Sequence, residues 1–521
     1  LILGFAARSI SMTSIVVHKV AYLTDIGIPL TQAGDALDVL DRVGLSTRDA
    51  CGNTVRNVTA CPMAGADPQQ AFDIQPYMGA FVRNFVRRDF TFNMPRKIEP
   101  AFSCGEHDCA TVGMHDVGFV ARVRDENGVT QEGFRIVVGG GTSIQPLVAQ
   151  TLYDFVPVED FLKVSEAVLR VFNDSASLRR NKMKARIKVL IHGEGVESYR
   201  EKVDQELQKD WALEYQADDS LLFLDPEQDD IPALPERVGP QGGDDVAFQA
   251  WRATNVFPQV EDGYRFVAVT VIRGDLTPDQ FRGLATISRS FASHRVRTTP
   301  EQNIMFRWVP ESRVFDLYRA LAALGLAEGG YNEITDVTSC PGTDSCKLGI
   351  TSSMGVNVAV QDALASPNGR TDLLSDPLVR KLHIKMSGCP NGCGRHHMAD
   401  IGFHGAAMHG PGGGQVPAYE LFVGGSQDGP SLRYGIRPRG RIPAKRVPEL
   451  TFQVLEHYRA NRHKGEALKD YAARVGREPF EKIIAGRAEV GPLGRDTLDL
   501  YMDFQKTILY KMERGEGECA V

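Results

Sequence analysis

Four cysteines in the C-terminal half of the 521-residue chain stand in two closely spaced pairs. Cys340 and Cys346 form C-x5-C in the word TSCPGTDSC, and Cys389 and Cys393 form C-x3-C in the word SGCPNGCG. Glycine and proline crowd both words, which is typical of loops whose backbone N–H groups can turn toward a sulfur atom. Thiolates from two such loops can surround one metal centre.

The spacing of the cysteines favours one kind of centre over another. A structural zinc ion usually draws on C-x2-4-C pairs, so the second pair is permitted and the first is too wide. An iron–sulfur cluster is larger than one ion, and a [4Fe–4S] cluster is held by four cysteine thiolates at wider spacings. The spacing therefore favours a cluster over zinc. Four buried structural thiols are a third interpretation, since free cysteine is among the most buried residue types, but the two Gly/Pro loops disfavour it.

The chain repeats itself at an offset of about 280 residues, which indicates duplication of one large unit rather than a solenoid. The matching words, in order, are TACP at 59–62 with TSCP at 338–341, MHDVGF at 114–119 with MADIGF at 398–403, and VGG at 138–140 with VGG at 423–425. In the first copy, Cys61 and Cys109 are the only cysteines at the four repeated positions. Asp67 and Gly105 stand at the other two, and Cys104 lies beside the second gap. The sequence therefore predicts one cluster, in the second copy.

Strand and helix patterns are mixed without regular alternation, so the predicted fold class is α+β. The β-branched runs at 134–138 and 185–191 predict strands, and helical spacing appears at 157–173 and 447–462. The segment at 226–245, rich in proline, glycine and acidic residues, predicts an exposed connector between the two copies.

The composition excludes several classes of protein. The formal net charge of −7 argues against nucleic acid as a partner, because phosphate binding needs a basic excess. No run approaches the length of about 18 apolar residues that a membrane span needs, and the first ten residues carry no basic segment ahead of their apolar stretch, so a secretory signal is not expected. Nine cysteines, an odd number at uneven spacing, fit a reducing compartment better than a disulfide framework. We therefore expect a cytoplasmic protein.

These words together resemble the siroheme and [4Fe–4S] sulfite/nitrite reductase family over nearly the whole chain. Besides the two cysteine words, the similar stretches are CGNTVRNVTACP, MPRKIEPAFS, NKMKARIKVLI and RTTPEQN. The resemblance implies that Cys340, Cys346, Cys389 and Cys393 hold the cluster, with Cys393 also the axial ligand of the siroheme iron. It also implies two paired ferredoxin-like half-domains and two larger α+β halves that bind the cofactors. The units expected are a ferredoxin-like half-domain at 1–45, a siroheme-binding half at 46–225, the connector at 226–245, a second half-domain at 246–328, a siroheme- and cluster-binding half at 329–495, and a tail at 496–521.

The resemblance also implies residues for the substrate and for siroheme. Arg56 and Lys97, with Arg96 as a neighbour, would bind a small oxyanion. The residues expected to bind siroheme, in addition to Cys393, are Lys184, Arg186, Arg297, Thr298 and Asn303. Lys184 and Arg186 belong to the basic run at 179–188, for which a solvated basic strand or a docking site for an acidic electron donor are the alternatives.

The chain departs from the family pattern at two positions. Glu99 stands where the family usually has a second basic residue, and Met12 stands in place of an arginine in a TTRQ-like word. Both changes remove positive charge from the expected anion pocket. The histidines near the cysteine loops are assigned no role; they are His107, His115, His396 and His397.

The predicted function is the six-electron reduction of sulfite to sulfide or of nitrite to ammonia, with sulfite slightly favoured. The alternatives are a non-catalytic electron-transfer homologue that has lost part of the anion pocket and a structural protein held together by zinc. The chain has no G-x-G-x-x-G word after a strand, so electrons are expected from a separate ferredoxin or flavoprotein. We expect a monomer with no nucleic-acid or membrane partner.

Overall fold

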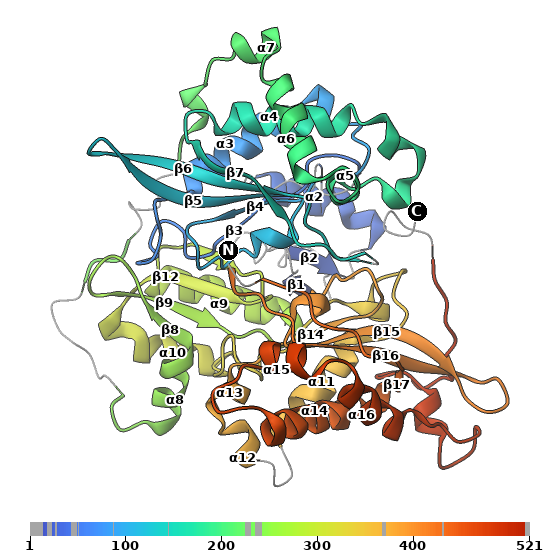
Figure 1. The fold of residues 1–521 in the computed structure, drawn as a ribbon. Helices are drawn as coiled ribbons and strands as arrows, with labels where there is room; N and C mark the ends of the chain where they lie inside the picture. Colours follow the sequence, from blue (N-terminus) through green and yellow to red (C-terminus); the bar gives the residue numbers. More distant parts are fainter. Residues whose placement is uncertain are drawn as a thin grey trace.

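The computed structural model confirms an α+β fold that contains one architecture twice. It describes residues 14–17, 23–26, 29–42, 49, 52–86, 88–143, 145–224, 231–234, 242–366, 371–429 and 432–515. In Figure 1 the first half lies at the top, the second half lies at the lower right, and a smaller α/β unit lies at the lower left.

Each half is built on a five-stranded mixed sheet with the same strand order. The sheet of the first half runs β3 (Thr59–Ala60), β4 (Pro100–Ser103), β5 (Val117–Glu126), β6 (Val129–Val138) and β7 (Gln150–Pro157). The sheet of the second half runs β13 (Thr338–Ser339), β14 (Ile384–Ser387), β15 (Ile401–His409), β16 (Gln415–Val423) and β17 (Ile442–Pro443). In both sheets the first three strands are parallel and the last two are antiparallel, as duplication of one unit requires.

Helices cover one face of each sheet and bury the apolar core. In the first half they are α3 (Gln75–Phe85), α4 (Phe161–Asn173), α5 (Ile187–Glu194), α6 (Val196–Glu206) and α7 (Asp210–Leu213). In the second half they are α11 (Ser353–Ala365), α12 (Thr371–Leu374), α13 (Pro377–Arg380), α14 (Val447–Asn461), α15 (Leu468–Val475) and α16 (Glu478–Ala488). Packed phenylalanine rings of α3, α4 and three strands centre the first core, where Phe102 and Phe119 stack at a centroid distance of 4.4 Å. Aromatic pairs of this kind add to the free energy of area burial.

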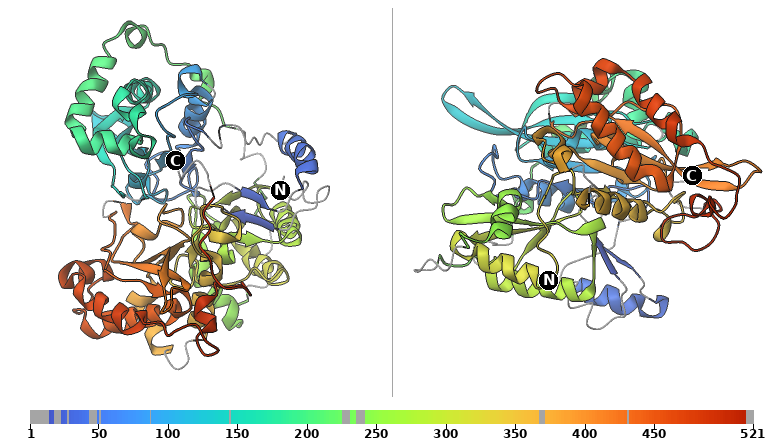
Figure 2. Two further views of the ribbon diagram at one scale, coloured as in Figure 1. Left: turned by 90° about the vertical axis from the view of Figure 1, so that its right-hand side faces the viewer. Right: turned by 90° about the horizontal axis from the view of Figure 1, so that it is seen from below.

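The smaller unit carries a four-stranded antiparallel sheet with helices packed on it. Its elements are α8 (Val246–Asn255), β8 (Val256–Pro258), β9 (Tyr264–Val269), α9 (Pro278–Phe291), β11 (Val296–Thr298), β12 (Ile304–Pro310) and α10 (Val314–Ala322). Near the N-terminus, β1 (Ser14–Val17) pairs with β2 (Leu23–Ile26) and with β10 (Asp275–Leu276), and α2 (Ala33–Asp41) follows. Figure 2 shows these N-terminal elements beside the smaller unit.

Most predicted elements are present, but one is wrong. The run at 134–138 lies in β6, and the helical patterns correspond to α4 and α14. The run at 185–191, predicted as a strand, instead forms the start of α5. Its buried residues include Ile187, Leu190 and Ile191, which are spaced as on one face of a helix and outweigh the β-branched composition. Of the connector at 226–245, the structure describes 231–234 and 242–245, and α8 begins directly afterwards.

Among the described helices, none is both long enough and apolar enough to cross a bilayer.

Candidate active site

The two cysteine loops of the second half begin at the same edge of its sheet. Cys340 directly follows β13, and the loop that contains Cys389 and Cys393 follows β14, which is the parallel neighbour of β13. The carboxyl ends of parallel strands meet at one edge, so the fold itself brings the loops together. The backbone N–H of Cys340 donates to the carbonyl of Met386 at 3.1 Å and fixes their relative height.

Glycines allow the two loops to approach closely. A Cβ added to Gly388 would lie 2.5 Å from the Cα of Gly342, so neither loop has room for a side chain at this crossing. The N–H of Gly388 donates to the Sγ of Cys340 at 3.1 Å. An amide directed at sulfur stabilises the thiolate form, which is the form that binds metal. Gly342 also has φ +58°, a conformation that favours glycine.

The four thiols lie in one electrostatic neighbourhood but differ in exposure. Cys340 and Cys389 are buried, Cys393 is half-buried and Cys346 is exposed. Burial first, and then charge on the other three cysteines, raise the pKa of the Cys389 thiol to about 12. Burial likewise raises the pKa of Cys340, with Cys393 as the next cause. The thiolates of Cys340 and Cys389 therefore need a positive centre beside them, and iron ions supply such a charge.

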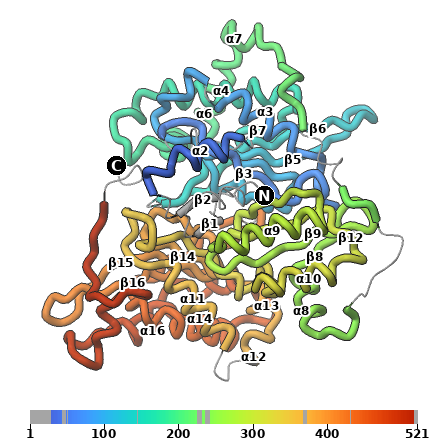
Figure 3. The backbone as a smooth tube through the Cα atoms, turned by 180° about the vertical axis from the view of Figure 1, so that it is seen from behind, coloured from blue at the N-terminus to red at the C-terminus, as the bar shows by residue number. Residues whose placement is uncertain are grey.

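The C-terminal segment packs against the loop of Cys346. Tyr510 donates its hydroxyl to the carbonyl of Ile350 at 2.8 Å, and the N–H of Gly515 donates to the carbonyl of Lys347 at 2.8 Å. Figure 3 shows this segment leaving the second half toward the first. The loop with the exposed thiol is thereby held from outside, while Asp344 to Lys347 stay open to solvent.

In the first half, the equivalent loops bring together a different set of side chains. One donor atom from each of five residues lies within 4.8 Å of every other; the residues are Cys61, Asp67, Cys104, His107 and Cys109. Cys61 and Cys109 form a disulfide bond. The sequence missed this group, because Cys104 does not align with a cluster cysteine and His107 was assigned no role.

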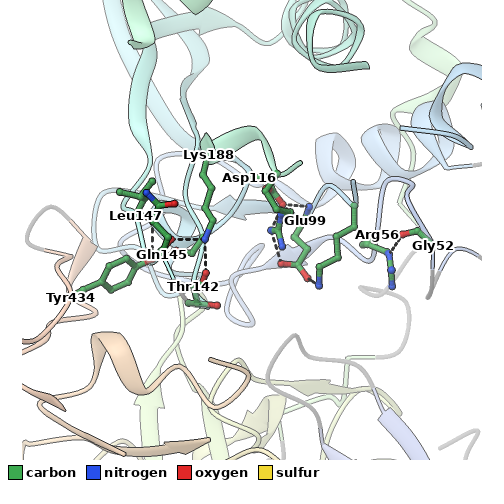
Figure 4. Close-up of polar contacts among 12 residues, drawn as sticks. Gly52, Arg56, Glu99, Asp116, Thr142, Gln145, Leu147, Lys188 and Tyr434 are labelled. Carbon is green, nitrogen blue, oxygen red and sulfur yellow. Dashed lines mark hydrogen bonds and ion pairs between the residues drawn. The ribbon is translucent and has the colours of Figure 1, made fainter. Parts of the chain in front are cut away.

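Arg56 and Lys97, the residues predicted to bind the anion, lie on neighbouring segments of the first half. Val55 forms a parallel bridge with Ile98, and the N–H of Arg56 donates to the carbonyl of Ile98 at 2.8 Å. The guanidinium Nε of Arg56 donates to the carbonyl of Gly52 at 2.9 Å (Figure 4). Arg96, the third predicted residue, is half-buried in the same loop as Lys97.

Glu99 is an acceptor for two of the expected cations. Lys97 Nζ lies 2.7 Å from Glu99 Oε1, and Arg186 Nη2 lies 3.1 Å from Glu99 Oε2. Arg186 also pairs with the buried carboxylate of Asp116 (Figure 4). Burial opposes the charge on Arg186, but the two carboxylates more than offset it and raise its pKa. The acidic residue at 99 therefore neutralises part of the positive charge near Lys97.

The side chains of Lys188 and Tyr434 hold the loop after β6, which lies between the charged residues around Glu99 and the second half. Lys188 Nζ donates to the carbonyls of Thr142 and Gln145, each at 2.6 Å, and the Tyr434 hydroxyl donates to the carbonyls at 141 and 147 (Figure 4). A Cβ on Gly392 would lie 2.8 Å from Thr142 Cβ. Thr142 therefore lies against the turn that carries Cys393, so the two halves meet beside this thiol.

The residues predicted to bind siroheme occupy three different environments. Arg297 and Thr298 lie on β11, where Arg297 donates to the side-chain oxygen of Gln75 in the first half. Asn303 uses both ends of its amide within the protein: Oδ1 accepts from the N–H of Val271 at 2.8 Å, and Nδ2 donates to Asp336 at 2.7 Å. The third environment is the basic run, where Lys184 is exposed.

Several cations are buried where the halves and the smaller unit meet. Burial lowers the pKa of Arg297 and of Arg307 to about 10, and Asp73 offsets it only in part. Burial also lowers the pKa of Lys385 and of Arg395. Arg395 has φ +60° and no exposed surface. Buried positive charge is costly unless an anion compensates it, and Glu301, 3.8 Å from Arg395, offsets the effect of burial on that arginine only in part. The donor set, four thiols together with Arg307, Lys385 and Arg395 as buried cations, fits a cluster together with a cofactor rich in carboxylates.

The position of Met12 lies outside the described residues, so the structure says nothing of that departure from the family pattern.

Comparison with known families agrees with this site. Residues 51–211 and again residues 330–490 match the family described as "Nitrite and sulphite reductase 4Fe-4S domain", and residues 257–324 match "Nitrite/Sulfite reductase ferredoxin-like half domain". The matched segments make up more than half of the chain. The chain belongs to the nitrite and sulfite reductase family. It is an oxidoreductase of this family, whose cofactors are siroheme and a [4Fe–4S] cluster.

Relatives named as sulfite reductases and relatives named as nitrite reductases are both similar to this chain. A sulfite reductase [ferredoxin] of Mycolicibacterium paratuberculosis is 28% identical over 84% of this chain and 73% of its own length. A ferredoxin–nitrite reductase of Synechococcus elongatus is 26% identical over 82% of this chain and 77% of its own length. The structure of Mycobacterium tuberculosis NirA protein covers 92% of this chain with a TM-score of 0.77 at 24% identity and covers 81% of its own chain, which shows a shared fold.

Proposed function

We propose that this chain reduces sulfite to sulfide, or nitrite to ammonia, in a six-electron reaction, with sulfite slightly favoured as the substrate. The observation that carries the proposal is the convergence of four thiols at the edge where the two halves meet. The relatives named above comprise both sulfite and nitrite reductases, so they do not separate the two substrates.

Cys340, Cys346, Cys389 and Cys393 would hold the cluster, and Cys393 would also ligate the siroheme iron. When bound, these groups would supply the one-electron transfers that the reduction of a small anion needs. The half-buried thiol of Cys393 suits a shared ligand, since its turn contacts the first half through Thr142. Arg297, Arg307 and Arg395 would compensate siroheme carboxylates; the burial of Arg307 and Arg395 and the lowered pKa of all three support this role.

The substrate residues would be Arg56, Lys97 and Arg96. Their segments are fixed by the bridge between Val55 and Ile98, so the backbone that carries Arg56 and Lys97 needs little reorganisation when an anion binds. An arginine fork and an ammonium group can donate to oxyanion oxygens and orient them for protonation. Glu99 limits this pocket by holding Lys97.

The electron donor would be a ferredoxin or a flavoprotein that docks over the loop of Cys346. This thiol is the exposed one of the four, so it offers the shortest path from the surface to the cluster. Residues 344–347 are also exposed. A small protein with a surface redox centre could therefore approach this edge without rearrangement of the fold.

Absorption spectroscopy and turnover of the purified protein test this proposal. We expect a chlorin-type red band with a broad cluster shoulder, and consumption of sulfite or nitrite with reduced viologen as donor. Parallel assays with each anion would rank the two substrates by kcat/KM. The correct spectrum without consumption of either anion would instead support the electron-transfer alternative, for which the ion pair of Glu99 with Lys97 is the supporting observation.

A further inference from the structure

The five donor residues of the first half form a compact group that the reaction does not use. Cys61 follows β3 and Cys104 follows β4, just as Cys340 and Gly388 follow β13 and β14. The two loops begin with the same backbone hydrogen bond. The N–H of Cys61 donates to the carbonyl of Phe102 at 3.1 Å, and the N–H of Cys340 donates to the carbonyl of Met386 at the same distance. The group therefore occupies, in the first half, the place of the cluster cysteines in the second.

The distances from His107 to Asp67, Cys104 and Cys109 suit a mononuclear site. His107 Nε2 lies 2.9 Å from Asp67 Oδ2, 3.7 Å from Cys104 Sγ and 3.9 Å from Cys109 Sγ. Two thiolates on one tetrahedral zinc ion lie about 3.8 Å apart, from Zn–S bonds of about 2.3 Å. A cubane cluster separates its thiolates by its own width and needs a wider opening. All five donor atoms lie within 4.8 Å of one another, which suits one ion.

The chemistry of the donors also selects the ion. Three sulfurs and one imidazole make the Cys3His set that structural zinc sites use, and soft sulfur ligands disfavour magnesium and calcium. Cys61, Asp67 and Cys104 are almost fully buried, while His107 is partly exposed. A surface hollow of about 580 Å³, lined in part by Gln69, Gly105 and His107, leads to the group from outside. An ion could therefore reach buried ligands past the His107 ring.

We propose that the reduced chain binds one zinc ion through Cys61, Cys104, Cys109 and His107, with Asp67 as the adjacent carboxylate. The disulfide between Cys61 and Cys109 and the metal compete for the same two sulfurs. A dithiol reductant supplies two electrons and two protons to open the disulfide and itself becomes a disulfide. Zinc then replaces the protons of three thiols, and three protons are released. A diazene oxidant reverses the process: its N=N bond takes two electrons from the Cys61 and Cys109 thiolates and two protons from water, the S–S bond re-forms, Cys104 takes up one proton, and the ion leaves.

The ion would fasten the two loops that face the second half. A Cβ on Gly429 would meet the carbonyl of Glu106 at 2.3 Å, so the loop at 104–109 packs tightly against the loop around 429 of the second half. Metal bound at Cys104 and His107 would therefore stiffen a contact between the halves. Oxidation would loosen it without touching the four cluster thiols.

Metal analysis of the full-length holoprotein, purified without oxygen in a dithiol buffer, tests the proposal. We expect one zinc per chain in addition to cluster and siroheme iron, and zinc K-edge absorption with three sulfur neighbours and one nitrogen. Cys104→Ala and His107→Ala should each weaken zinc retention against a chelator by about tenfold or more, with iron content unchanged. A diazene oxidant should release the zinc, and a dithiol with zinc chloride should restore it.

Cys346→Ser is the matched control, since it should lower iron and leave zinc in place. This control also separates the two proposals, because a failed cluster assignment would change only the iron result. The zinc site is refuted if the reduced protein neither contains zinc nor takes it up from zinc chloride. Equal zinc retention in the wild type and in both donor variants would refute it as well. His107→Ala keeps the test decisive if Cys104→Ala fails to fold, because His107 is partly exposed.

Discussion

Glu99 offers a direct test of the anion pocket, because it pairs with a residue proposed to bind substrate. Its carboxylate lies 2.7 Å from Lys97 Nζ and 3.1 Å from Arg186 Nη2. Glu99→Gln keeps the shape of the side chain and removes its charge. Arg186 stays anchored, since it also pairs with Asp116. We therefore expect Lys97 to become available to the substrate without collapse of the surrounding structure.

The size of the expected change in KM follows from the geometry around Glu99. An oxyanion held by Lys97 would lie about 5–6 Å from the Glu99 carboxylate, the sum of two charge-assisted hydrogen-bond lengths. Repulsion of unit charges at that distance is about 0.8 kcal/mol at the dielectric constant of water and about 3 kcal/mol at an effective value of 20. The side chains of Lys97 and Glu99 are 22% and 27% exposed, so water screens the pair and the lower end applies. A gain of about 1 kcal/mol corresponds to a KM about fivefold lower.

Steady-state kinetics with reduced viologen would measure this effect for sulfite and for nitrite at two salt concentrations. The gain should shrink at high salt, because screening weakens both the repulsion and the attraction. Glu126→Gln is the matched control, since Glu126 also pairs with an arginine, Arg124 at 3.0 Å, but lies exposed at the end of β5. An unchanged or raised KM in Glu99→Gln, with full cofactor content, would show that Lys97 does not face the substrate.

Three further predictions concern the second half. Cys393→Ser should remove both the cluster and the siroheme signals, whereas Cys346→Ser should remove cluster iron and keep more of the siroheme band. Iron analysis and absorption spectra distinguish the two variants. An intact spectrum with full activity in Cys393→Ser would contradict the role of Cys393 as a shared ligand. Gly388→Ala should abolish cluster assembly, because its Cβ would lie 2.5 Å from the Cα of Gly342, and a normal iron content would contradict the loop geometry. Burial raises the pKa of Asp336 to about 6. Between about pH 4 and pH 6 the folded state therefore keeps a proton on Asp336 that the unfolded state has lost. The free energy of unfolding falls as pH rises through this range. The free energy of unfolding of Asp336→Asn should lose this pH dependence, which is worth at most about 3 kcal/mol. In thermal melts at pH 5 and pH 7, the melting temperature of the wild type should therefore fall relative to that of the variant. An equal change of melting temperature in both proteins would contradict the prediction.

The duplication could be predicted from the sequence because both copies keep short words at strand ends. TACP and TSCP lie where β3 and β13 run into their loops, and the cysteine in each donates its N–H to the neighbouring strand. Local composition was less reliable at 185–191. There the β-branched residues suit a strand, and only packing of Ile187 and Leu190 against the first core selects the helix.

The four cysteines could be predicted as cluster ligands because their spacing carries the chemistry, whereas the charge balance of the proposed pocket depends on distant contacts. Glu99 was visible as a departure from the family pattern, but its second partner, Arg186, lies 87 residues away in sequence. The group around His107 was missed for a similar reason. His107 lies three residues after Cys104, but its role depends on Asp67, which the fold brings beside it from another loop.

The two halves differ at their metal-binding edge by an exchange of neighbours, Ser103-Cys-Gly105 in one and Ser387-Gly-Cys389 in the other. Consecutive Cα atoms are about 3.8 Å apart, so the exchange moves the thiol by one residue along the loop. In the second half the glycine admits the facing loop and leaves the thiol farther out. In the first half the thiol itself fills the crossing, fully buried and 3.6 Å from Asp67. One duplicated scaffold thus fits centres of two sizes, because backbone geometry is shared and only the position of sulfur along it has changed.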